Sequence, residues 1–455
     1  MKNNSFLYFS KALLVFGFAL NIFANAQQWD NVGSVTTVSA GGSGYNNLAI
    51  DASGNYYLSY YDTSVAKGTV QKFDGNAWSY LGGTAGITTG TATFSSLTLD
   101  AQGNPYYSNQ ISYPGTGMEV RTFVSGSWTL LPNVTANTVN YQATAISPSN
   151  ILFAYSSDGS GTVRKYVNGA WEQVGTAGFA GGATFAEMVI GSDNNIYVCQ
   201  IASGVKVYRI SANATSSDSW TLLGGAALGN GYTSDNSFSD IALDGNNNPY
   251  VVYVSSSAEG RKLNVKKFDG NSWIQIGAAN FSDTVVNNTA ITVGSEGTPY
   301  VVASIWDSSN ANHTKNSVYK FNSGTSVWTK IGGDFVSDGA ATFSDLAIDK
   351  VNNYLVLAYS QSGTKVKRIS LSTLAVNDIQ TQNTIGIYPN PTKGAVNIKT
   401  NSKIKSVEVT NTVGQIVSTK SSEQQVDLTN VPSGIYFVKA VFGGGNTIVK
   451  KVIKE

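Results

Sequence analysis

The residue types that could do chemistry are few, and most of them lie in one loop. The only histidine, His313, follows Trp306 and Asp307 in the segment Trp306-Asp-Ser-Ser-Asn-Ala-Asn-His313. An indole ring beside a carboxylate and an imidazole can stack on a sugar ring and hydrogen-bond its hydroxyl groups. A solvated loop with one half-buried aromatic residue is the simpler interpretation, since isolated apolar residues at a surface are normal. The sequence therefore predicts a ligand site at these three residues only as an alternative to that loop.

Other catalytic chemistry is poorly represented. The single cysteine, Cys199, lies in the strand-like run Ile196-Tyr-Val-Cys-Gln, far in sequence from His313, which favours a small buried residue over a nucleophile. One histidine does not assemble a usual zinc site. Turns such as Asp51-Ala-Ser-Gly-Asn55 lack the bidentate glutamate of a calcium loop, so they are interpreted as structural. The sequence indicates no metal, no cofactor and no assigned catalytic residue.

The elements that must position any site belong to a repeat. In seven places a tryptophan opens a short apolar run, usually ending at glycine, and from the first to the last such tryptophan the mean step is about 50 residues. These tryptophans are Trp29, Trp78, Trp128, Trp171, Trp220, Trp273 and Trp328. Because each occupies the same repeat position, they are predicted to pack between neighbouring units rather than to form one sugar pocket each.

Each repeat predicts four antiparallel strands. In the fullest copy the strands are 238–243, 250–254, 263–268 and 273–276, with turn residues between them. Seven such units between residues 27 and 372 predict a seven-bladed β-propeller. The last unit has no tryptophan strand of its own, whereas Trp29 precedes the first complete unit. The Trp29 strand is therefore predicted to complete the last blade, which leaves no bare sheet edge.

Residues 1–26 are typical of a secretory signal peptide. Lys2 and Lys11 flank the apolar stretch 12–23, and Ala24-Asn-Ala26 is a small-x-small cleavage site. The rest of the chain has no segment apolar enough to cross a bilayer. We expect the mature chain to be exported and to carry no transmembrane segment.

The composition changes after the repeats. A polar linker at 373–384 leads to residues 385–455, where short alternating strands and turns predict a small immunoglobulin-like sandwich. This segment resembles the type A C-terminal sorting domain of Bacteroidota type IX secretion cargo. The matching positions are Tyr388, Pro389, Asn390, Pro391, Gly394, Asn411, Gly414, Gly434, Ile435, Tyr436, Lys450, Lys451 and Lys454. The resemblance implies handling by the type IX machinery, followed by release or by attachment to the outer-membrane surface.

Charge narrows the function of the repeats. The segment from residue 377 has a net charge of +4 and residues 27–376 have a net charge of −5. A mildly acidic surface without a basic stripe gives no support for nucleic-acid binding. The sequence favours a non-catalytic binding module for glycans or proteins outside the cell. A glycan-degrading enzyme with acids at the propeller channel and a passive surface scaffold or adhesin remain as alternatives, although the acidic residues recur at turns and no unit stands out as rich in acids.

Overall fold

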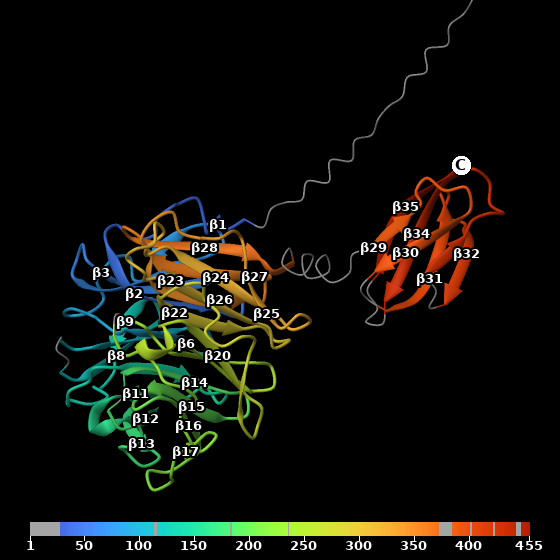
Figure 1. Ribbon diagram of the computed structural model, residues 1–455. Coiled ribbons are helices and arrows are strands. Elements are labelled where there is room, and N and C mark those ends of the chain that lie inside the picture. The colour runs from blue at the N-terminus through green and yellow to red at the C-terminus, as the bar shows by residue number, and fades with distance from the viewer. Residues whose placement is uncertain are drawn as a thin grey trace, which may run out of the picture.

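The computed structural model describes residues 28–112, 116–182, 184–234, 236–372, 385–400, 403–421, 424–442 and 447–455. The predicted signal peptide, with its cleavage site at Ala24 and Ala26, and the predicted linker lie outside these residues. Within them the chain consists of β-strands and connecting turns, and helix is limited to short turns such as η1 (Asp158–Ser160) and η2 (Ser257–Glu259). The all-β prediction is confirmed (Figure 1).

Between Asp30 and Ser370 the described strands form seven antiparallel sheets of four strands each. The first three sheets are β2 (Ser43–Ile50), β3 (Tyr56–Asp62), β4 (Lys67–Phe73) and β5 (Trp78–Tyr80); β6 (Ser96–Leu99), β7 (Pro105–Gln110), β8 (Met118–Val124) and β9 (Ser127–Leu130); and β10 (Gln142–Ile146), β11 (Leu152–Ser156), β12 (Thr162–Val167) and β13 (Ala170–Val174). The next two are β14 (Thr184–Ile190), β15 (Asn195–Ile201), β16 (Val205–Ser211) and β17 (Thr221–Leu222); and β18 (Asp240–Leu243), β19 (Pro249–Val254), β20 (Leu263–Phe268) and β21 (Trp273–Gln275). The last two are β22 (Val286–Val293), β23 (Pro299–Ile305), β24 (Asn316–Asn322) and β25 (Val327–Lys330); and β26 (Thr342–Asp349), β27 (Tyr354–Ser360), β28 (Thr364–Ser370) and β1 (Asp30–Asn31).

The first strands of the seven sheets lie side by side in a closed cycle. Strands β2, β6, β10, β14, β18, β22 and β26 each contact the next, and β26 contacts β2 again. The second strands are the most buried: every residue of β19, from Pro249 to Val254, is buried. A strand covered on both faces reads as a continuous apolar run, which is how Tyr250-Val-Val-Tyr-Val254 reads in the sequence. The sheets therefore form a propeller-like ring.

The turns between first and second strands are held by aspartate. Oδ1 of Asp51 accepts the backbone N–H groups of Ser53 and Asn55, each at 2.9 Å. Asp100 and Asp244 make the same pair of bonds in their own turns. An aspartate that bonds the backbone two residues ahead fixes a tight turn. The interpretation of these turns as structural is confirmed.

The repeated tryptophans join each sheet to the one before it. The indole N–H of Trp78 donates to Val32 O at 3.0 Å, and that of Trp328 donates to Ile276 O at 2.9 Å. The same kind of bond, to a carbonyl of the preceding sheet, is made by Trp29, Trp128, Trp171 and Trp273. The exception is Trp220, whose indole N–H is buried without a partner and whose ring stacks on Phe179 at 4.0 Å. Packing between neighbouring units is confirmed as the role of these residues.

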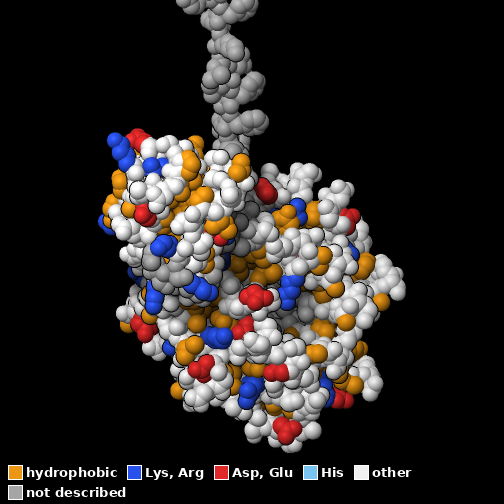
Figure 2. Space-filling view, turned by 90° about the vertical axis from the view of Figure 1, so that its right-hand side faces the viewer, with side chains coloured by type: hydrophobic (Ala, Val, Ile, Leu, Met, Phe, Trp, Pro, Cys, Tyr) orange, Lys and Arg blue, Asp and Glu red, His pale blue; other side chains and the backbone are white. Residues whose placement is uncertain are grey.

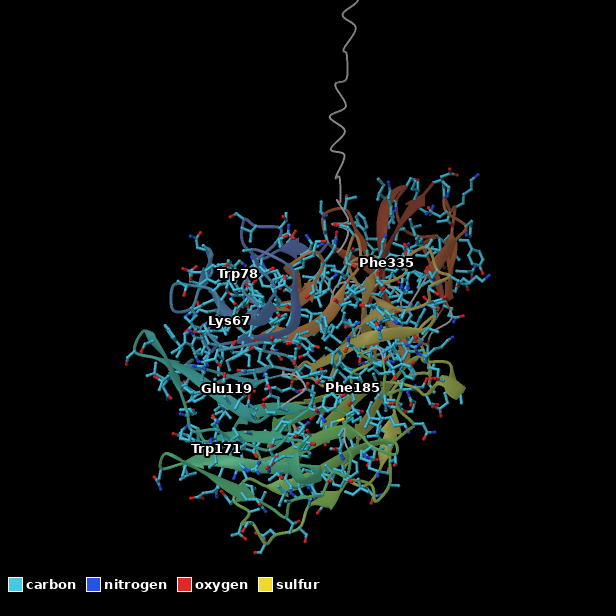
Figure 3. All side chains as sticks on the ribbon, turned by 90° about the vertical axis from the view of Figure 1, so that its left-hand side faces the viewer. Lys67, Trp78, Glu119, Trp171, Phe185 and Phe335 are labelled. Carbon is cyan, nitrogen blue, oxygen red and sulfur yellow. The ribbon has the colours of Figure 1, made fainter. Side chains whose placement is uncertain are left out.

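Trp78 and Trp171 lie toward the periphery of the ring, and Phe185 lies nearer its middle (Figure 3).

The first strand of the repeat segment and its last three strands form one sheet. Strand β1 pairs with β28, with Asp30 opposite Arg368 and Asn31 opposite Lys367. The N–H of Val32 continues the ladder by donating to Val366 O at 2.9 Å. The prediction that the Trp29 strand completes the last sheet is confirmed, and Figure 1 shows β1 beside β28.

The glycine that ends most of the tryptophan runs makes room for the next tryptophan. At Gly277 the backbone has φ +69°, and a Cβ atom would lie 2.8 Å from Cδ1 of Trp328. Gly270 also has a positive φ, +101°, but nothing lies within 4 Å of its Cβ position. Both Gly→Ala changes incur a left-handed backbone penalty of roughly 1–2 kcal/mol. We expect Gly277→Ala to lower the free energy of unfolding by about 1–3 kcal/mol more than Gly270→Ala, because it also overpacks the tryptophan. Urea unfolding of both variants measures the difference, and equal losses would show that the close contact is unimportant.

The C-terminal residues form two further sheets. Strands β32 (Ile416–Ser421), β31 (Ile404–Asn411), β34 (Gly434–Phe442) and β35 (Thr447–Lys454) lie in that order in one, and β29 (Ile385–Tyr388), β30 (Ala395–Thr400) and β33 (Gln425–Asp427) in the other. A separate apolar core, which includes Val407, Val438 and Val452, lies among these strands. This part of the chain therefore has a hydrophobic core of its own.

Candidate functional site

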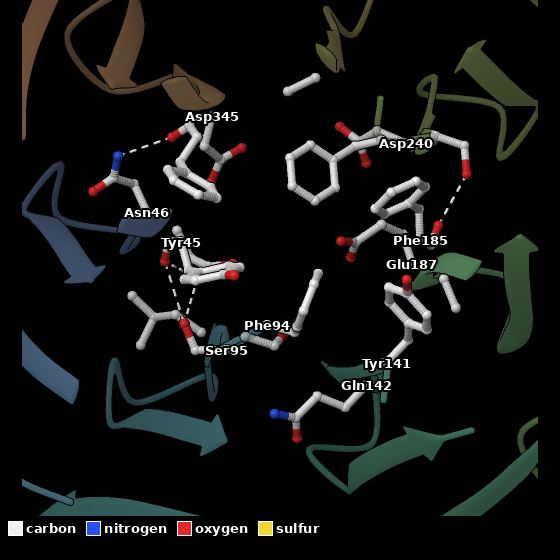
Figure 4. Close-up of a pocket in the computed structure, with 18 of the residues that line it drawn as sticks. Tyr45, Asn46, Phe94, Ser95, Tyr141, Gln142, Phe185, Glu187, Asp240 and Asp345 are labelled. Atoms are coloured by element: carbon white, nitrogen blue, oxygen red, sulfur yellow. Dashed lines mark hydrogen bonds between the residues drawn. The ribbon is translucent and has the colours of Figure 1, made fainter. Parts of the chain in front are cut away.

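Six aromatic rings at one repeat position surround the middle of the ring of sheets. We call this set the collar: Tyr45, Phe94, Tyr141, Phe185, Phe238 and Phe343. Each ring contacts the next around a closed circle, with centroids 4.5 to 6.4 Å apart. Figure 4 shows collar residues from successive sheets turned toward a common opening. A mostly regular sequence repeat thus places one aromatic ring from each of six sheets at the same level of the channel.

Left-handed backbone conformations aim several collar rings. The φ angles are +53° at Tyr45, +45° at Phe94, +48° at Phe185 and +50° at Phe343. In β2, β14 and β26 the strand register shifts at the collar residue. A bulge of this kind redirects a side chain, and it is common beside functional sites. Because a bulky residue at positive φ carries a penalty of roughly 1–3 kcal/mol, this geometry stores backbone strain at the collar.

The seventh position of the collar has no ring. Asn288 occupies it, with φ +49° and almost complete burial. Its Oδ1 accepts the N–H of Phe343 at 2.8 Å, and its Nδ2 donates to Asn287 Oδ1 at 2.8 Å. The flanking rings of Phe238 and Phe343 are the widest pair, at 6.4 Å. The collar is therefore widest beside the sixth sheet.

The collar borders a central cavity of about 220 Å³. Besides the rings, its lining is mainly polar and includes Asn47, Ser96, Gln142 and Thr144. Gln142 is 4% exposed, and neither its amide oxygen nor its amide nitrogen has a hydrogen-bond partner. Buried polar groups are normally paired. Gln142 is an exception to this rule, and it borders the cavity in Figure 4.

Two aspartates of the cavity tie neighbouring sheets together. Asp240 accepts the N–H of Ile241 at 2.7 Å and that of Ile291, in the next sheet, at 2.8 Å. Asp345 accepts the N–H of Leu346 at 2.8 Å and that of Leu48 at 2.7 Å. Ser96 takes the equivalent place in the second sheet, where its Oγ accepts the N–H of Thr144 at 3.1 Å. These two carboxylates therefore have a structural role between the first strands.

Glu187 occupies the same repeat position and makes no such bond. It lies two residues after Phe185, as Asp240 lies two residues after Phe238. The N–H of Ile241, which a carboxylate at this position would receive from the next sheet, already donates to Asp240. Among the described residues the Glu187 side chain has no hydrogen-bond partner, and Figure 4 shows it extending into the opening. Its presence has no explanation in the packing of the sheets.

Burial and mutual repulsion raise the pKa values of the three carboxyl groups of the cavity. Burial raises the pKa of Glu187 well above its usual value, and the carboxylates of Asp240 and Asp345 raise it further. Burial raises the pKa of Asp240 to about 6, although backbone N–H groups oppose the shift. Burial and the charge of Asp240 raise the pKa of Asp345 to about 7. Carboxyl groups in one enclosed space resist simultaneous ionisation, so at neutral pH the cavity holds both protonated and ionised acids.

The sequence interpretation overlooked this site. The expectation that acidic residues serve turns is right for Asp51 and Asp244, but it is wrong for Glu187, Asp240 and Asp345. The signal that could have revealed the site is a phenylalanine followed two residues later by an acid, in three units at the same repeat position. Whether a strand-start aromatic faces the channel or a neighbouring sheet depends on a local bulge, which the sequence pattern does not reveal.

The predicted ligand loop lies at the same end of β22 as Asn288, on the widest side of the collar. The N–H of Trp306 donates to Val285 O at 2.8 Å, and the Trp306 and His313 rings have centroids 5.3 Å apart. Asp307 accepts hydrogen bonds from Ser309 and Thr284, which lower its pKa. The three residues share one loop, which is tied to residues 284 and 285, and His313 Nδ1 is buried there without a hydrogen-bond partner. A ligand role for them stays a prediction.

The remaining candidates for chemistry are Cys199 and a possible metal site. Cys199 is fully buried and unpaired, and burial raises the pKa of its thiol, so the prediction of a small buried residue is confirmed. In the described ranges no group of three or more His, Cys, Asp or Glu side chains is arranged to hold a metal ion. Charged side chains of both signs are scattered over the face in Figure 2, without a continuous basic stripe.

The residues of the C-terminal motif hold the last strand. Asn390 donates from Nδ2 to Lys451 O at 3.0 Å and accepts the N–H of Ile453 at 2.8 Å. The peptide bonds before Pro389 and Pro391 are cis. Tyr436 is buried, and its hydroxyl donates to Pro432 O at 2.8 Å. The glycines of the motif lie at turns or at a strand start, with Gly394 beside Thr429, Gly414 at φ +83° and Gly434 opening β34, while Lys450 and Lys451 are exposed on β35.

Comparison with known families decides the nature of this part of the chain. Residues 386–455 match the family of secretion system C-terminal sorting domains. The C-terminal segment is a type A sorting domain of the type IX secretion system. The sorting domain marks the chain as cargo of that system, which is exported and either secreted or held at the outer surface. Among the described residues no helix is long and apolar enough to span a membrane.

Solved structures add information about the fold. The chain is similar to PorZ, described as an essential bacterial surface component of the type IX secretion system of Porphyromonas gingivalis, with a TM-score of 0.50 and 15% identity over 92% of this chain and 60% of PorZ. It spans less than two thirds of that protein. A weaker similarity links it to the Aleuria aurantia lectin, with a TM-score of 0.42 and 15% identity; the match covers 67% of this chain and 98% of the lectin. Another links it to an ulvan lyase, with a TM-score of 0.47 and 12% identity; that match covers 74% of this chain and 96% of the lyase. No curated protein matches the sequence.

Proposed function

We propose that residues 27–372 form a seven-bladed β-propeller that works outside the cell as a non-catalytic binding module, with its ligand site at the collar. In this proposal residues 385–455 form an immunoglobulin-like sandwich that serves export. Seven four-stranded sheets whose first strands contact one another in a closed cycle support the propeller. The sorting domain supports an extracellular place of action.

The observation that carries the proposal is the collar itself. Six rings are turned toward one opening, at least four of them from a strained left-handed backbone. A passive scaffold has no need for such strain, which accumulates where a site must be held in one shape. The cavity behind the collar combines aromatic rings with convergent polar groups such as Gln142 and Glu187, and polar groups placed beside aromatic side chains fix the orientation of ligands in binding pockets.

The size of the cavity limits what can enter it. A volume of about 220 Å³ is smaller than the roughly 300–1,000 Å³ of sites for drug-sized ligands. One protruding group fits, such as a side chain of a protein partner or a terminal substituent of a glycan. We therefore expect recognition of a small group at the end of a larger molecule.

Binding to an array of glycans and peptides tests the proposal. In the purified protein, Tyr141→Ala is expected to weaken any reproducible binding by about tenfold or more, the effect of losing a ring contact and its hydrogen bond. Trp306→Ala removes an aromatic residue from the predicted loop at the same end of β22 and is expected to leave binding unchanged. If Trp306→Ala abolishes binding and Tyr141→Ala does not, the ligand site is the loop of Trp306, Asp307 and His313, and the collar proposal is wrong.

A second function, glycan cleavage, is favoured by one observation. Glu187 keeps a high pKa beside carboxylates that ionise more readily, and such a pairing is what a general acid requires. Against this function, Asp240 and Asp345 each receive two backbone N–H groups, which lowers their basicity. Release of reducing ends from polysaccharides by the protein, and its loss in Glu187→Gln, would establish an enzyme in place of a binding module.

A further inference from the structure

We infer that the group bound at the collar is an organic ammonium ion carried on a slender chain, such as the end of a lysine side chain or of an alkylamine. This inference rests on the proposed function and adds the chemical class of the ligand. It requires rings that can face a cation, negative groups within reach and no competing positive charge. The cavity meets all three requirements.

The collar provides the rings. An aromatic face attracts a cation within about 6 Å of its centroid, and several rings around one space form the cage that recognises alkylammonium groups. Neighbouring collar centroids lie 4.5 to 6.4 Å apart around the opening. A cation in that opening can therefore lie near several rings at once. A strongly hydrated metal ion gains less there, since the rings offer no oxygen ligands.

The carboxyl groups provide the negative charge. Glu187 comes from β14, Asp240 from β18 and Asp345 from β26, so the three approach the cavity from different sheets. The other titratable groups of the lining are the phenols of Tyr45 and Tyr141, and the described lining contains no lysine, arginine or histidine. The negative charge of the cavity is therefore not balanced by the protein.

A half-buried carboxylate and a buried amide of the lining are available to a guest. Glu187 has no hydrogen-bond partner among the described residues and extends into the opening (Figure 4). Gln142 is buried with both amide atoms unpaired on the lining of the same cavity. An ammonium group has three N–H donors and no acceptor, so it can satisfy the Glu187 carboxylate. The carboxylates of Asp240 and Asp345 contribute charge while keeping their bonds between sheets.

Binding of the cation opposes protonation of the acids. Burial and mutual repulsion keep protons on these groups in the empty cavity, with a pKa of about 6 for Asp240 and about 7 for Asp345. A cation favours the ionised forms, so its uptake releases protons. The affinity should accordingly rise between about pH 5 and about pH 8, the range in which these acids ionise.

Calorimetry with three probes tests the inference on the full protein. The probes are n-pentylammonium, the neutral n-pentanol and a short peptide that presents one lysine side chain. We expect n-pentylammonium to bind at about pH 8 at least about tenfold more tightly than n-pentanol, the ratio that 1.4 kcal/mol provides, and to bind more weakly at about pH 5. The peptide distinguishes the source of the group: tighter binding than the free amine indicates a protein partner, and weaker binding indicates a small amine.

Two glutamate variants complete the experiment. Glu187→Gln keeps the shape of the side chain and is expected to weaken n-pentylammonium binding by about tenfold. Glu172→Gln, on the outermost strand β13 where the carboxylate is exposed, is the matched control and should bind as the wild type does. Equal binding of amine and alcohol, or equal binding by Glu187→Gln and wild type, overturns the cationic ligand. If Tyr141→Ala still impairs array binding in that case, the collar remains a binding site for a neutral group; if it does not, the proposed function fails as well.

Discussion

Replacing Trp29 with alanine is expected to lower the free energy of unfolding of the ring by about 3–5 kcal/mol, the cost of truncating a buried tryptophan. Trp29 is buried, and its indole N–H donates to Ile331 O at 3.1 Å. The pairing that it supports is short, since β1 consists of Asp30 and Asn31 alone. Without Trp29 the last sheet loses a contact with the sixth sheet, and β28 becomes an exposed sheet edge. Urea unfolding, followed by tryptophan fluorescence and circular dichroism, measures the loss.

Trp171 is the matched control for Trp29. It occupies the same repeat position in the third sheet, and its indole N–H donates to Pro132 O at 2.7 Å in an exposed setting. We expect Trp171→Ala to lower stability by about 0.5–3 kcal/mol, as an ordinary substitution does. Deletion of Trp29–Gly33 should destabilise the ring at least as much as Trp29→Ala does. If the deletion leaves a cooperative transition unchanged, closure of the ring by β1 is not important for its stability.

Stability should fall as the pH rises from about 4 to about 7, and Glu187→Gln should reduce that fall. Asp345 has a pKa of about 7 in the folded protein against a usual value of 3.8, and Asp240 has a pKa of about 6. Between the usual and the raised pKa the folded protein holds protons that the unfolded chain has lost, so stability decreases with rising pH. Glu187→Gln removes one of three mutually repelling acids and so lowers the cost of ionising the other two.

We expect Glu187→Gln to be more stable than the wild type at about pH 8 by roughly 1 kcal/mol or more, the equivalent of about one pKa unit, and nearly equal to it at about pH 4. Denaturant unfolding at the two pH values gives the comparison, and Glu172→Gln controls for the loss of a charge outside the cavity. Acids such as Asp158 and Asp244, whose pKa values are lowered, act in the opposite direction, but only toward and below their usual range. If the free energies of unfolding of the wild type and of Glu187→Gln fall by the same amount between the two pH values, repulsion within the cavity is contradicted.

The repeat architecture could be predicted from the sequence because its determinants are local. A tryptophan at each repeat position and an aspartate at several of the strand-to-strand turns specify neighbouring contacts, such as the bond of Trp78 to Val32 O and of Asp51 to Ser53 N. The place of the Trp29 strand followed from counting strands, and the sorting domain followed from a compact motif. Each of these features depends on residues that are close in sequence or recur at a constant spacing.

The candidate site depends on contacts that the sequence order does not display. Tyr45 belongs to the first sheet along the chain and Phe343 to the last. Their aromatic rings nevertheless have centroids 4.5 Å apart, because the sheets close into a cycle. Glu187, Asp240 and Asp345 come from three sheets, and each taken alone reads as an ordinary polar position in a strand. Sequence alone thus determined the sheets, their order and the export of this protein, since short-range patterns encode them. The tertiary structure decided which side chains face the channel, because ring closure and local bulges set the direction of each side chain and the burial that shifts its pKa.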